Sequence, residues 1–364
     1  AISPQVNDWL DRNTSTGSAE TGNEEKPFFM WVNVWDPHTP YRTPTEFKNP
    51  FTDDPIPDWY GEEVRQDHWQ KAGPHSPQEV NGYIPAPEWM FRGGEGSIIH
   101  ERQPKQISDM DEARKMFDGY DMGVAYADKH VGEIVQKLKT LGLYEDTAII
   151  ISADHGENLG ELWVYGDHQT ADQFTHNIPM VVRWPGVTDD RAGEMDSRLM
   201  YNIDLAATTL ELAGKCDLSQ WDGKSFADSI DKPVPHRESL VLSQMAWCAQ
   251  RSARWDHYLC IETYHDSWHD YPEFMVFDLE ADPHEQVNLA DSRPELLEEG
   301  TKILKEWKKD CLETAHVKED PKDTVLAEGG PLHARGEGPD YLERLKNTGR
   351  EKIAERLKAK HQVE

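Results

Sequence analysis

The chain has 364 residues and a formal net charge of -30, with 68 acidic against 38 basic side chains. A field of that sign repels nucleic acid and anionic lipid, which excludes both as general partners. Hydrophobic residues make up 37% of the chain and include 13 Trp, so the composition predicts a folded core and argues against broad disorder. No apolar stretch of about 18 residues occurs, so no membrane-spanning helix is expected.

The first part of the chain alternates predicted strands and helices. The opening residues are typical of the end of a helix, and residues 28–35 (FFMWVNVW) form a nearly continuous apolar run, which predicts a strand buried on both faces. The further predicted elements are a helix from Asp109 to a stop at Gly142, strands at 147–152 and 179–184, and a helix at 203–213. This alternation predicts an α/β fold with a mostly parallel sheet flanked by helices.

Residues 42–107 are rich in Pro, Trp, Gly and charged residues and lack periodicity, which predicts a long ordered cover over a functional site. Its aromatic residues could stack on sugar faces or simply anchor the loop, and both interpretations stay open for Trp59, Trp69, Tyr83 and Trp89.

After residue 235 the pattern of predicted elements changes from alternating strands and helices to short strands separated by polar turns. Short strands at 240–245, 258–262 and 274–279, followed by a helix at 294–309, predict a small antiparallel sheet that packs against a helix. The remaining residues are charged and carry one amphipathic helix at 341–357. The chain is therefore predicted to divide into a main domain at 1–235, a subdomain at 236–312 and a helical tail at 313–364.

Cysteine usage and the first residues leave the compartment open. The four cysteines are scattered without a C-x-x-C pair, which argues against a disulfide framework or a zinc site; they are Cys216, Cys248, Cys260 and Cys311. Free buried thiols are expected, although Cys248 and Cys260 could face each other across a hairpin. The chain begins at Ala1 without a signal-peptide pattern, so we expect a processed chain or a piece of a longer one, cytoplasmic or exported.

Two polar clusters directly follow predicted strands, at residues 36–41 (DPHTPY) and 154–161 (DHGENLGE). Open α/β sheets bind ligands at the edge where parallel strands end. The carboxylate of Asp154 and the imidazole of His155 can both turn toward one cation, and a carboxylate suits a hard ion such as Ca²⁺ or Mg²⁺. A polar surface turn is the alternative, but the strand before this pair and Gly156 after it favour a site.

At this point the sequence resembles the sulfatase family of the alkaline phosphatase superfamily. The similar segments are ISADHGENLGE, GDHQTAD, NIPMVVRWPG, WVNVWDPHTPY, MYNIDLAATTLELAG with DGKSF, and FDLEADPHEQVNLA. They occur in family order and cover most of residues 1–310. The resemblance implies an alkaline phosphatase-like α/β domain, a C-terminal subdomain with an antiparallel sheet and a helix, and hydrolysis of sulfate esters.

The resemblance also implies roles for individual residues. Asp154 and His155 match the family's later metal pair, with Ca²⁺ the expected ion and Mg²⁺ the alternative. His38 matches the histidine that contacts the sulfate ester near its leaving oxygen. His168 is expected to bind the sulfate, because Asp167 stands where the family usually has a lysine.

Arg42 follows the histidine loop and is a candidate for binding an anionic substrate, with a plain surface arginine as the alternative. The histidines at 176, 257, 265 and 269 are expected to be ordinary core or surface residues.

The family's nucleophile is a formylglycine made from the first residue of a C/S-x-P/A-x-R motif. None of the four cysteines begins such a motif, and the family's early acidic metal ligands are absent too. The chain therefore looks like the later two-thirds of a sulfatase, and by itself we expect it to be inactive. The whole protein is predicted to cleave the sulfate ester of a carbohydrate or small molecule, with a divalent cation and a formylglycine outside this chain.

Two alternatives to this function stay open. One is hydrolysis of a phosphoester or phosphonate within the same superfamily, and the other is a non-catalytic fragment that binds ligands through a degenerate site. The oligomeric state is left open.

Overall fold

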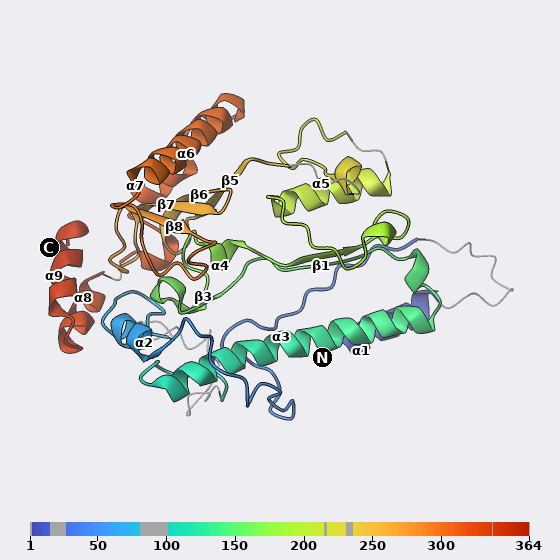
Figure 1. Ribbon diagram of the computed structural model, residues 1–364, viewed down its shortest axis with the longest axis horizontal. Coiled ribbons are helices and arrows are strands. Elements are labelled where there is room, and N and C mark those ends of the chain that lie inside the picture. The colour runs from blue at the N-terminus through green and yellow to red at the C-terminus, as the bar shows by residue number, and fades with distance from the viewer. Residues whose placement is uncertain are drawn as a thin grey trace.

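The computed structural model describes residues 2–14, 27–80, 101–214, 217–230, 236–336 and 338–363. The helices in chain order are α1 (Ser3–Thr14), α2 (Glu62–Trp69), α3 (Met110–Thr140), α4 (Gln173–His176), α5 (Asn202–Ala213), α6 (Pro294–Thr314), α7 (Pro321–Ala327), α8 (Gly338–Asn347) and α9 (Glu351–Lys360). The strands are β1 (Ile149–Ser152), β2 (Asn158–Leu159), β3 (Tyr165–Asp167), β4 (Met180–Arg183), β5 (Ser239–Gln244), β6 (Ala249–Trp255), β7 (Tyr258–His265) and β8 (Phe274–Asp278). The four-stranded sheet lies toward one end of the molecule and the long helix α3 runs along one side (Figure 1).

The long helix α3 begins and ends where the sequence predicts. The side chain of Asp109 accepts a hydrogen bond from the backbone N–H of Glu112 at 2.9 Å, so it satisfies one of the free donors of the first turn. Gly142 follows the last turn with a φ of 71°, a left-handed conformation that stops helices. The buried face of α3 carries Met116 and Phe117, which pack into the core beneath the 36–41 loop.

The prediction of a strand buried on both faces at residues 28–35 is wrong. The segment is extended, but its side chains alternate between half-buried and exposed, so it is not buried on both faces. Phe28 and Met30 pack with α1 and α3, whereas Phe29 and Trp31 are each 82% exposed. Within the described residues, 28–34 make no backbone–backbone hydrogen bond. A strand is buried on both faces only when neighbours cover both, and the described part of the chain covers one.

The expected parallel sheet is also corrected within the described residues. β1 pairs with β4 in antiparallel register, from Ile149 opposite Arg183 to Ser152 opposite Met180. Every strand pair in the described part of the chain is antiparallel. The chain turns back between β1 and β4 through the β2–β3 hairpin and the short helix α4, so the next strand returns in the opposite direction.

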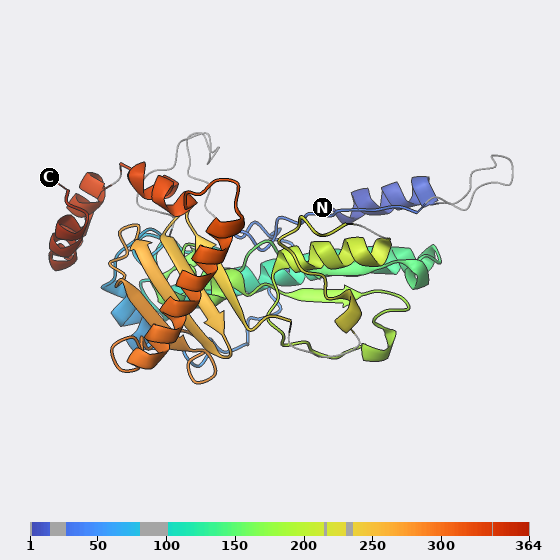
Figure 2. The ribbon, with the colours of Figure 1, turned by 90° about the horizontal axis from the view of Figure 1, so that it is seen from above.

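The C-terminal sheet has the order β5-β6-β7-β8, and α6 lies across one face of it (Figure 2). Cys260 and Val276 face α6, where Leu296 is buried with them. Leu259 and Ile261 point to the other face and pack with residues of the 162–171 segment. The predicted antiparallel sheet with its helix is thus confirmed, and its second face supports the segment that leads to the candidate site. The division of the chain at residues 235 and 312 stays a prediction.

Strand β6 was not predicted, because its residues, AQRSARW, are mostly polar. Its third residue, Arg251, is buried and bonds Asp320 through two nitrogens, at 2.6 and 2.7 Å. An ion pair of this kind lets a charged side chain occupy a buried strand position.

The tail differs from its prediction as a single helix at 341–357. Two helices, α8 and α9, form a hairpin that breaks at Gly349, where φ is 80°. Tyr341 and Leu345 of α8 are fully buried, and with Leu357 of α9 they pack against Trp268.

The prediction of free buried thiols is confirmed for Cys248 and Cys260 and is wrong in burial for Cys311. Cys248 and Cys260 are free and fully buried, and Cys311 is free and exposed. Cys216 lies outside the described residues. None of the described helices is apolar over a length that would cross a bilayer.

The buried histidine His68 predicts acid sensitivity. Its Nδ1 forms a hydrogen bond with the Tyr165 hydroxyl at 2.8 Å, and burial lowers the pKa of His68 from 6.5 to about 4. As the pH falls, His68 is protonated below about pH 6.5 in the unfolded chain but only below about pH 4 in the folded chain. The free energy of unfolding therefore decreases as the pH is lowered over that range. His68→Gln keeps an acceptor without titrating, and it should reduce the loss in unfolding free energy between pH 7 and pH 5 by about 2 kcal/mol.

Urea unfolding of both proteins at the two pH values measures this difference. An unchanged difference between the two pH values in the variant would show that His68 is not the titrating group.

Candidate functional site

Two polar loops, at 36–41 and 154–157, line a large cleft, and a third polar segment, at 165–168, meets the second loop through the stacked rings of His168 and His155. The cleft has a volume of about 2620 Å³, and its walls are the extended segment 28–35, β1, α3 and α5. The first two loops contribute to its lining Asp36, His38, Asp154, His155 and Glu157. The two clusters that the sequence singled out therefore open into the same space.

His38 presents one nitrogen of its ring to this space. Its Nδ1 lies 2.5 Å from the carbonyl oxygen of Thr39, and because a carbonyl only accepts, Nδ1 carries the proton. The ring stacks on Trp35 with 4.5 Å between centroids, and the side chain is exposed. Nε2 is thus the nitrogen left to meet a ligand.

Asp154 and His155 have the chemistry of a partial cation site. Asp154 Oδ2 and His155 Nε2 lie 3.9 Å apart, and the Asp154 side chain is 90% exposed. His155 Nδ1 donates to the carbonyl of Gly156 at 2.8 Å, which leaves the Nε2 lone pair available for a metal. Both residues therefore fit a divalent cation. Because Ca²⁺ takes about 6–8 oxygen ligands, further ligands must join them.

The strand exit that carries this pair is fixed by α4. The N–H of Gly156 donates to the carbonyl of Thr175 at 2.8 Å, and a Cβ at Gly156 would lie 1.8 Å from the Phe174 carbonyl oxygen. α4 is capped by Asp172, a fully buried carboxylate that accepts from the Phe174 N–H at 3.0 Å and from Asn158 Nδ2 at 2.8 Å. A short helix held from inside thus sets the path of the metal-ligand loop.

A hydrogen bond joins the first two loops. The hydroxyl of Tyr41 donates to Glu157 Oε1 at 2.6 Å, and Tyr41 is buried. Desolvation raises the pKa of Glu157 to about 8, although the bond from Tyr41 opposes the rise. This contact keeps the His38 loop and the Asp154 loop in register with each other.

Residues 165–168 meet a histidine from the turn at 71–80, His75, that the sequence analysis did not identify. His75 Nε2 lies 3.0 Å from Asp167 Oδ2, and His168 Nδ1 lies 3.2 Å from Asp167 Oδ1, so one carboxylate sits between two imidazoles. Burial acts to raise the pKa of Asp167, but the charges of His75 and His168 outweigh it and hold that pKa well below its usual range. The missed signal is a repeated tetrapeptide: Pro-His-Ser-Pro at 74–77 matches Pro-His-Thr-Pro at 37–40.

The structure brings together two of the predicted residues from different loops. The rings of His155 and His168 stack with 3.7 Å between centroids and 22° between planes. Burial lowers the pKa of His168, with help from the charges of neighbouring histidines, while Asp167 opposes the shift. Arg42 is exposed and does not line the cleft.

The aromatic residues of the 42–107 cover divide into two groups. Trp59 lines the cleft and stacks on His284 with 4.5 Å between centroids, and Trp69 is half-buried. Tyr83 and Trp89 lie outside the described residues.

One close group of three possible metal ligands occurs elsewhere in the described part of the chain. His265, Asp266 and His361 place their ligand atoms within 4.8 Å of one another. Both oxygens of Asp266 are already engaged, one by His361 at 2.7 Å and the other by the ammonium of Lys360 at 2.5 Å. We interpret this group as a balanced charge cluster that ties α9 to the end of β7.

The tight packing of Gly156 generates a prediction. Gly156→Ala forces a methyl group against the Phe174 carbonyl and should destabilise the fold by about 1–3 kcal/mol. Gly132→Ala is the matched control, because Gly132 lies exposed within α3 with nothing within 4 Å of its added Cβ. The control should be more stable by about 0.5–1 kcal/mol. Urea unfolding compares the two, and an equal gain in both would contradict this account of the loop.

Comparison with known proteins places this arrangement in a family. The model of the family named Sulfatase matches residues 4–215, and a model described as N-sulphoglucosamine sulphohydrolase, C-terminal, matches residues 160–316. The first match spans more than half of the chain and includes all three loops of the candidate site.

Similar proteins agree with this placement. The chain is 24% identical over 320 residues to N-acetylglucosamine-6-sulfatase of Bos taurus, covering 78% of this chain and 52% of that protein. It is 25% identical over 286 residues to choline-sulfatase of Rhizobium meliloti (strain 1021), covering 76% and 49%. The chain thus spans about half the length of the curated relatives that it matches.

Solved structures show the same fold. One, of a protein in complex with its substrate D-glucosamine-2-N,6-O-disulfate, has a TM-score of 0.61 at 18% identity and covers 86% of this chain and 70% of that one. A phosphonate monoester hydrolase of Agrobacterium radiobacter has a TM-score of 0.57 at 20% identity, with coverage of 81% and 57%. The expected alkaline phosphatase-like fold is confirmed. With the family model over residues 4–215, these likenesses show that the chain belongs to the sulfatase family of the alkaline phosphatase superfamily.

Proposed function

We propose that the whole protein is a metal-dependent sulfuric ester hydrolase that acts on a sulfated carbohydrate or a small sulfate ester. The observation that carries the proposal is that His38, Asp154 and His155 line one cleft, with Nδ1 of each histidine held by a backbone carbonyl so that its Nε2 is left for a ligand. The names of the relatives point to sulfated amino sugars and choline sulfate as the kinds of substrate.

Asp154 and His155 are the proposed protein ligands of one divalent cation. Ca²⁺ is preferred, because the exposed carboxylate is a hard oxygen ligand, and Mg²⁺ is the alternative. When bound, the ion supplies Lewis-acid chemistry by withdrawing charge from the oxygens of the sulfate group.

The histidines of the site bind the ester and handle protons. His38, with Nδ1 held by a carbonyl, directs Nε2 to the leaving oxygen and protonates or stabilises it. His168 binds the sulfate through Nε2, since its Nδ1 faces the carboxylate of Asp167. Burial lowers the pKa of His168 while Asp167 opposes the shift, so a protonated His168 in place of the family's usual lysine depends on the added negative charge of the bound sulfate. Neither Arg42 nor His168 is among the residues that line the cleft, but the ring of His168 stacks on that of His155, whereas Arg42 is exposed and is assigned no role.

The nucleophile, a formylglycine, and the remaining cation ligands are proposed to come from a segment outside these residues. The shape of the cleft supports this. Residues 28–34 present an unpaired main chain among the described residues, and Phe29 and Trp31 are each 82% exposed beside it. An added strand would pair these free groups and cover these side chains. Without that segment, the chain by itself is not expected to turn over a sulfate ester.

Removal of the proposed carboxylate ligand tests the cation site. In the full-length protein, Asp154→Ala should abolish both bound metal and turnover, because an anionic ligand is lost. Asp291→Ala is the matched control, since Asp291 is exposed in the turn before α6. Metal content by inductively coupled plasma mass spectrometry and hydrolysis of an aryl sulfate are the two measurements. Retained Ca²⁺ with normal turnover in Asp154→Ala would refute the assignment.

The role of His38 has a different signature. His38→Ala in the full-length protein should lower kcat by roughly 10²- to 10⁴-fold, because a proton donor at the leaving oxygen is lost, while the metal content stays the same. An equal fall in metal occupancy would make His38 a cation ligand and not a substrate contact.

Substrate class is tested by parallel assays of aryl sulfates and aryl phosphates on the full-length protein. We expect faster sulfate turnover. Faster phosphate or phosphonate turnover would favour the second hydrolase interpretation, and absence of both activities in a protein with a complete upstream frame would favour a non-catalytic one.

A further inference from the structure

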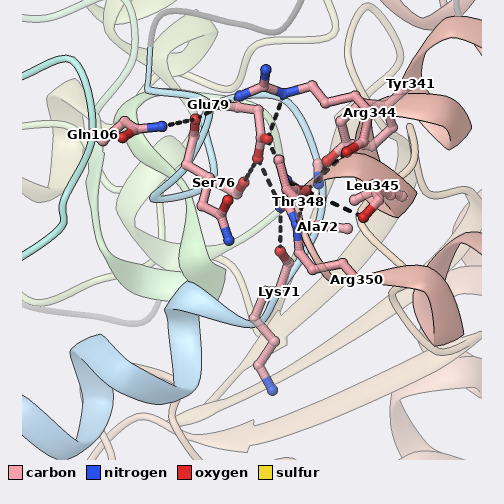
Figure 3. A network of polar contacts seen from close by, with 12 residues as sticks. Lys71, Ala72, Ser76, Glu79, Gln106, Tyr341, Arg344, Leu345, Thr348 and Arg350 are labelled. Carbon is pink, nitrogen blue, oxygen red and sulfur yellow. Dashed lines mark hydrogen bonds and ion pairs between the residues drawn. The ribbon is translucent and has the colours of Figure 1, made fainter.

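The helical hairpin α8–α9 lies beyond both family matches, which end at residues 215 and 316. It nevertheless contacts the turn at 71–80, which lies about 270 residues earlier in the chain. The contact is a charge network centred on Glu79, whose carboxylate is buried (Figure 3).

Two arginines of the hairpin region hold Glu79. Arg350 bonds both carboxylate oxygens, at 2.5 and 2.9 Å, and Arg344 Nε donates to Oε1 at 2.8 Å. The same guanidinium groups donate to backbone carbonyls of the turn, Arg350 to Lys71 at 2.8 Å and Arg344 to Gln78 at 3.1 Å. The planar fork of arginine suits this two-oxygen grip, and it holds the turn by its main chain as well as by Glu79.

The turn is held rigidly between these contacts. The N–H of Gly73 donates to the hydroxyl of the fully buried Tyr341 at 2.5 Å, and Gly73 has a φ of 118°. A Cβ at Gly73 would lie 2.1 Å from the ring of His269, whose Nε2 lies 3.0 Å from the carbonyl of Pro74. Packing from α8 and from the β7–β8 connection thus leaves the turn little room to shift.

The turn presents His75 to the candidate site. The N–H of His75 donates to the carbonyl of Glu79 at 3.0 Å, and the carbonyl of His75 accepts from the N–H of Tyr165 in β3 at 2.9 Å. Nε2 of the His75 ring lies 3.0 Å from Asp167 Oδ2, and Asp167 Oδ1 lies 3.2 Å from Nδ1 of His168. An unbroken series of contacts therefore runs from the hairpin to the histidine that stacks on His155.

We propose that the α8–α9 hairpin is a positioning element of the candidate site: Arg344 and Arg350 fix Glu79, the turn at Glu79 presents His75, and His75 orients Asp167 and His168. The inference deepens the proposed function, because the oriented His168 is the residue proposed to bind the sulfate. His75 is accordingly a positioning residue, since it acts on the substrate through Asp167 and His168.

The test uses the full-length protein with Arg344→Gln, Arg350→Gln and His75→Gln. Arg356→Gln is the matched control, because Arg356 is also an arginine of the hairpin but forms an exposed ion pair with Asp270 at 2.6 Å. Hydrogen–deuterium exchange by mass spectrometry, read on peptides over 73–79 and 165–168, is the first measurement. We expect exchange there to be at least about tenfold faster in the Arg344 and Arg350 variants and unchanged in the control.

Turnover is the second measurement. Arg344→Gln and His75→Gln should each lower kcat by roughly 10- to 100-fold at unchanged metal content, as for residues that orient a group in contact with substrate. If Arg344 acts through His75, the double variant should be no slower than His75→Gln alone. Independent, multiplied losses would overturn the proposed route.

The two measurements separate this inference from the proposed function. If the protein lacks sulfatase activity, faster exchange at 165–168 still supports the positioning role. If exchange rises only within the hairpin and stays unchanged at 165–168, the inference is overturned, whatever the activity. Should Arg350→Gln fail to fold, Arg344→Gln and His75→Gln decide alone, because Arg344 is part-exposed and leaves the Arg350–Glu79 pair intact.

Discussion

The main-chain polar groups of an extended segment need partners, and this constraint shapes the whole first half of the molecule. Within the described chain, the main-chain groups of residues 28–34 have no backbone partner on either edge of the segment. The inward-facing side chains of the segment nevertheless pack on α1 and α3. The same segment forms one wall of the cleft, and its outer side chains Phe29 and Trp31 are exposed there. The strand proposed to add here would pair these main-chain groups and cover these side chains.

Much of the fold was predictable because its signals are local. The side chain of Asp109 marks the start of α3, and the strand-then-glycine pattern around Asp154 marks a loop at a strand end. Strand direction was not predictable, because it depends on how the chain turns back between β1 and β4. The contact of His75 with Asp167 was not predictable for a similar reason, because the two residues lie about 90 residues apart; only the repeated tetrapeptide at 74–77 marks His75 in the sequence.

The net charge of -30 contrasts with the local composition of the candidate site. A chain so acidic repels an anionic ester at long range, yet the site gathers His38, His75, His155 and His168 around its polar loops. Asp167 lies among them, and the charges of His75 and His168 hold the pKa of its carboxyl well below the usual range although burial acts to raise it. Under the proposed function, attraction of the substrate would fall to short-range contacts and to the proposed cation, where screening by salt is weakest.

The contact between α6 and the sheet buries one cysteine, so chemical labelling of that thiol can report when α6 separates from the sheet. A Cβ at Gly300 would lie 2.3 Å from that of Cys260, so no alkylating reagent can reach this thiol while the helix is seated. Burial also raises the pKa of Cys260 to about 12, which suppresses the reactive thiolate. Exposed Cys311, on the same helix, is accessible in the closed state. The ratio of labelling at these two thiols therefore measures how often α6 separates from β7, without any engineered probe.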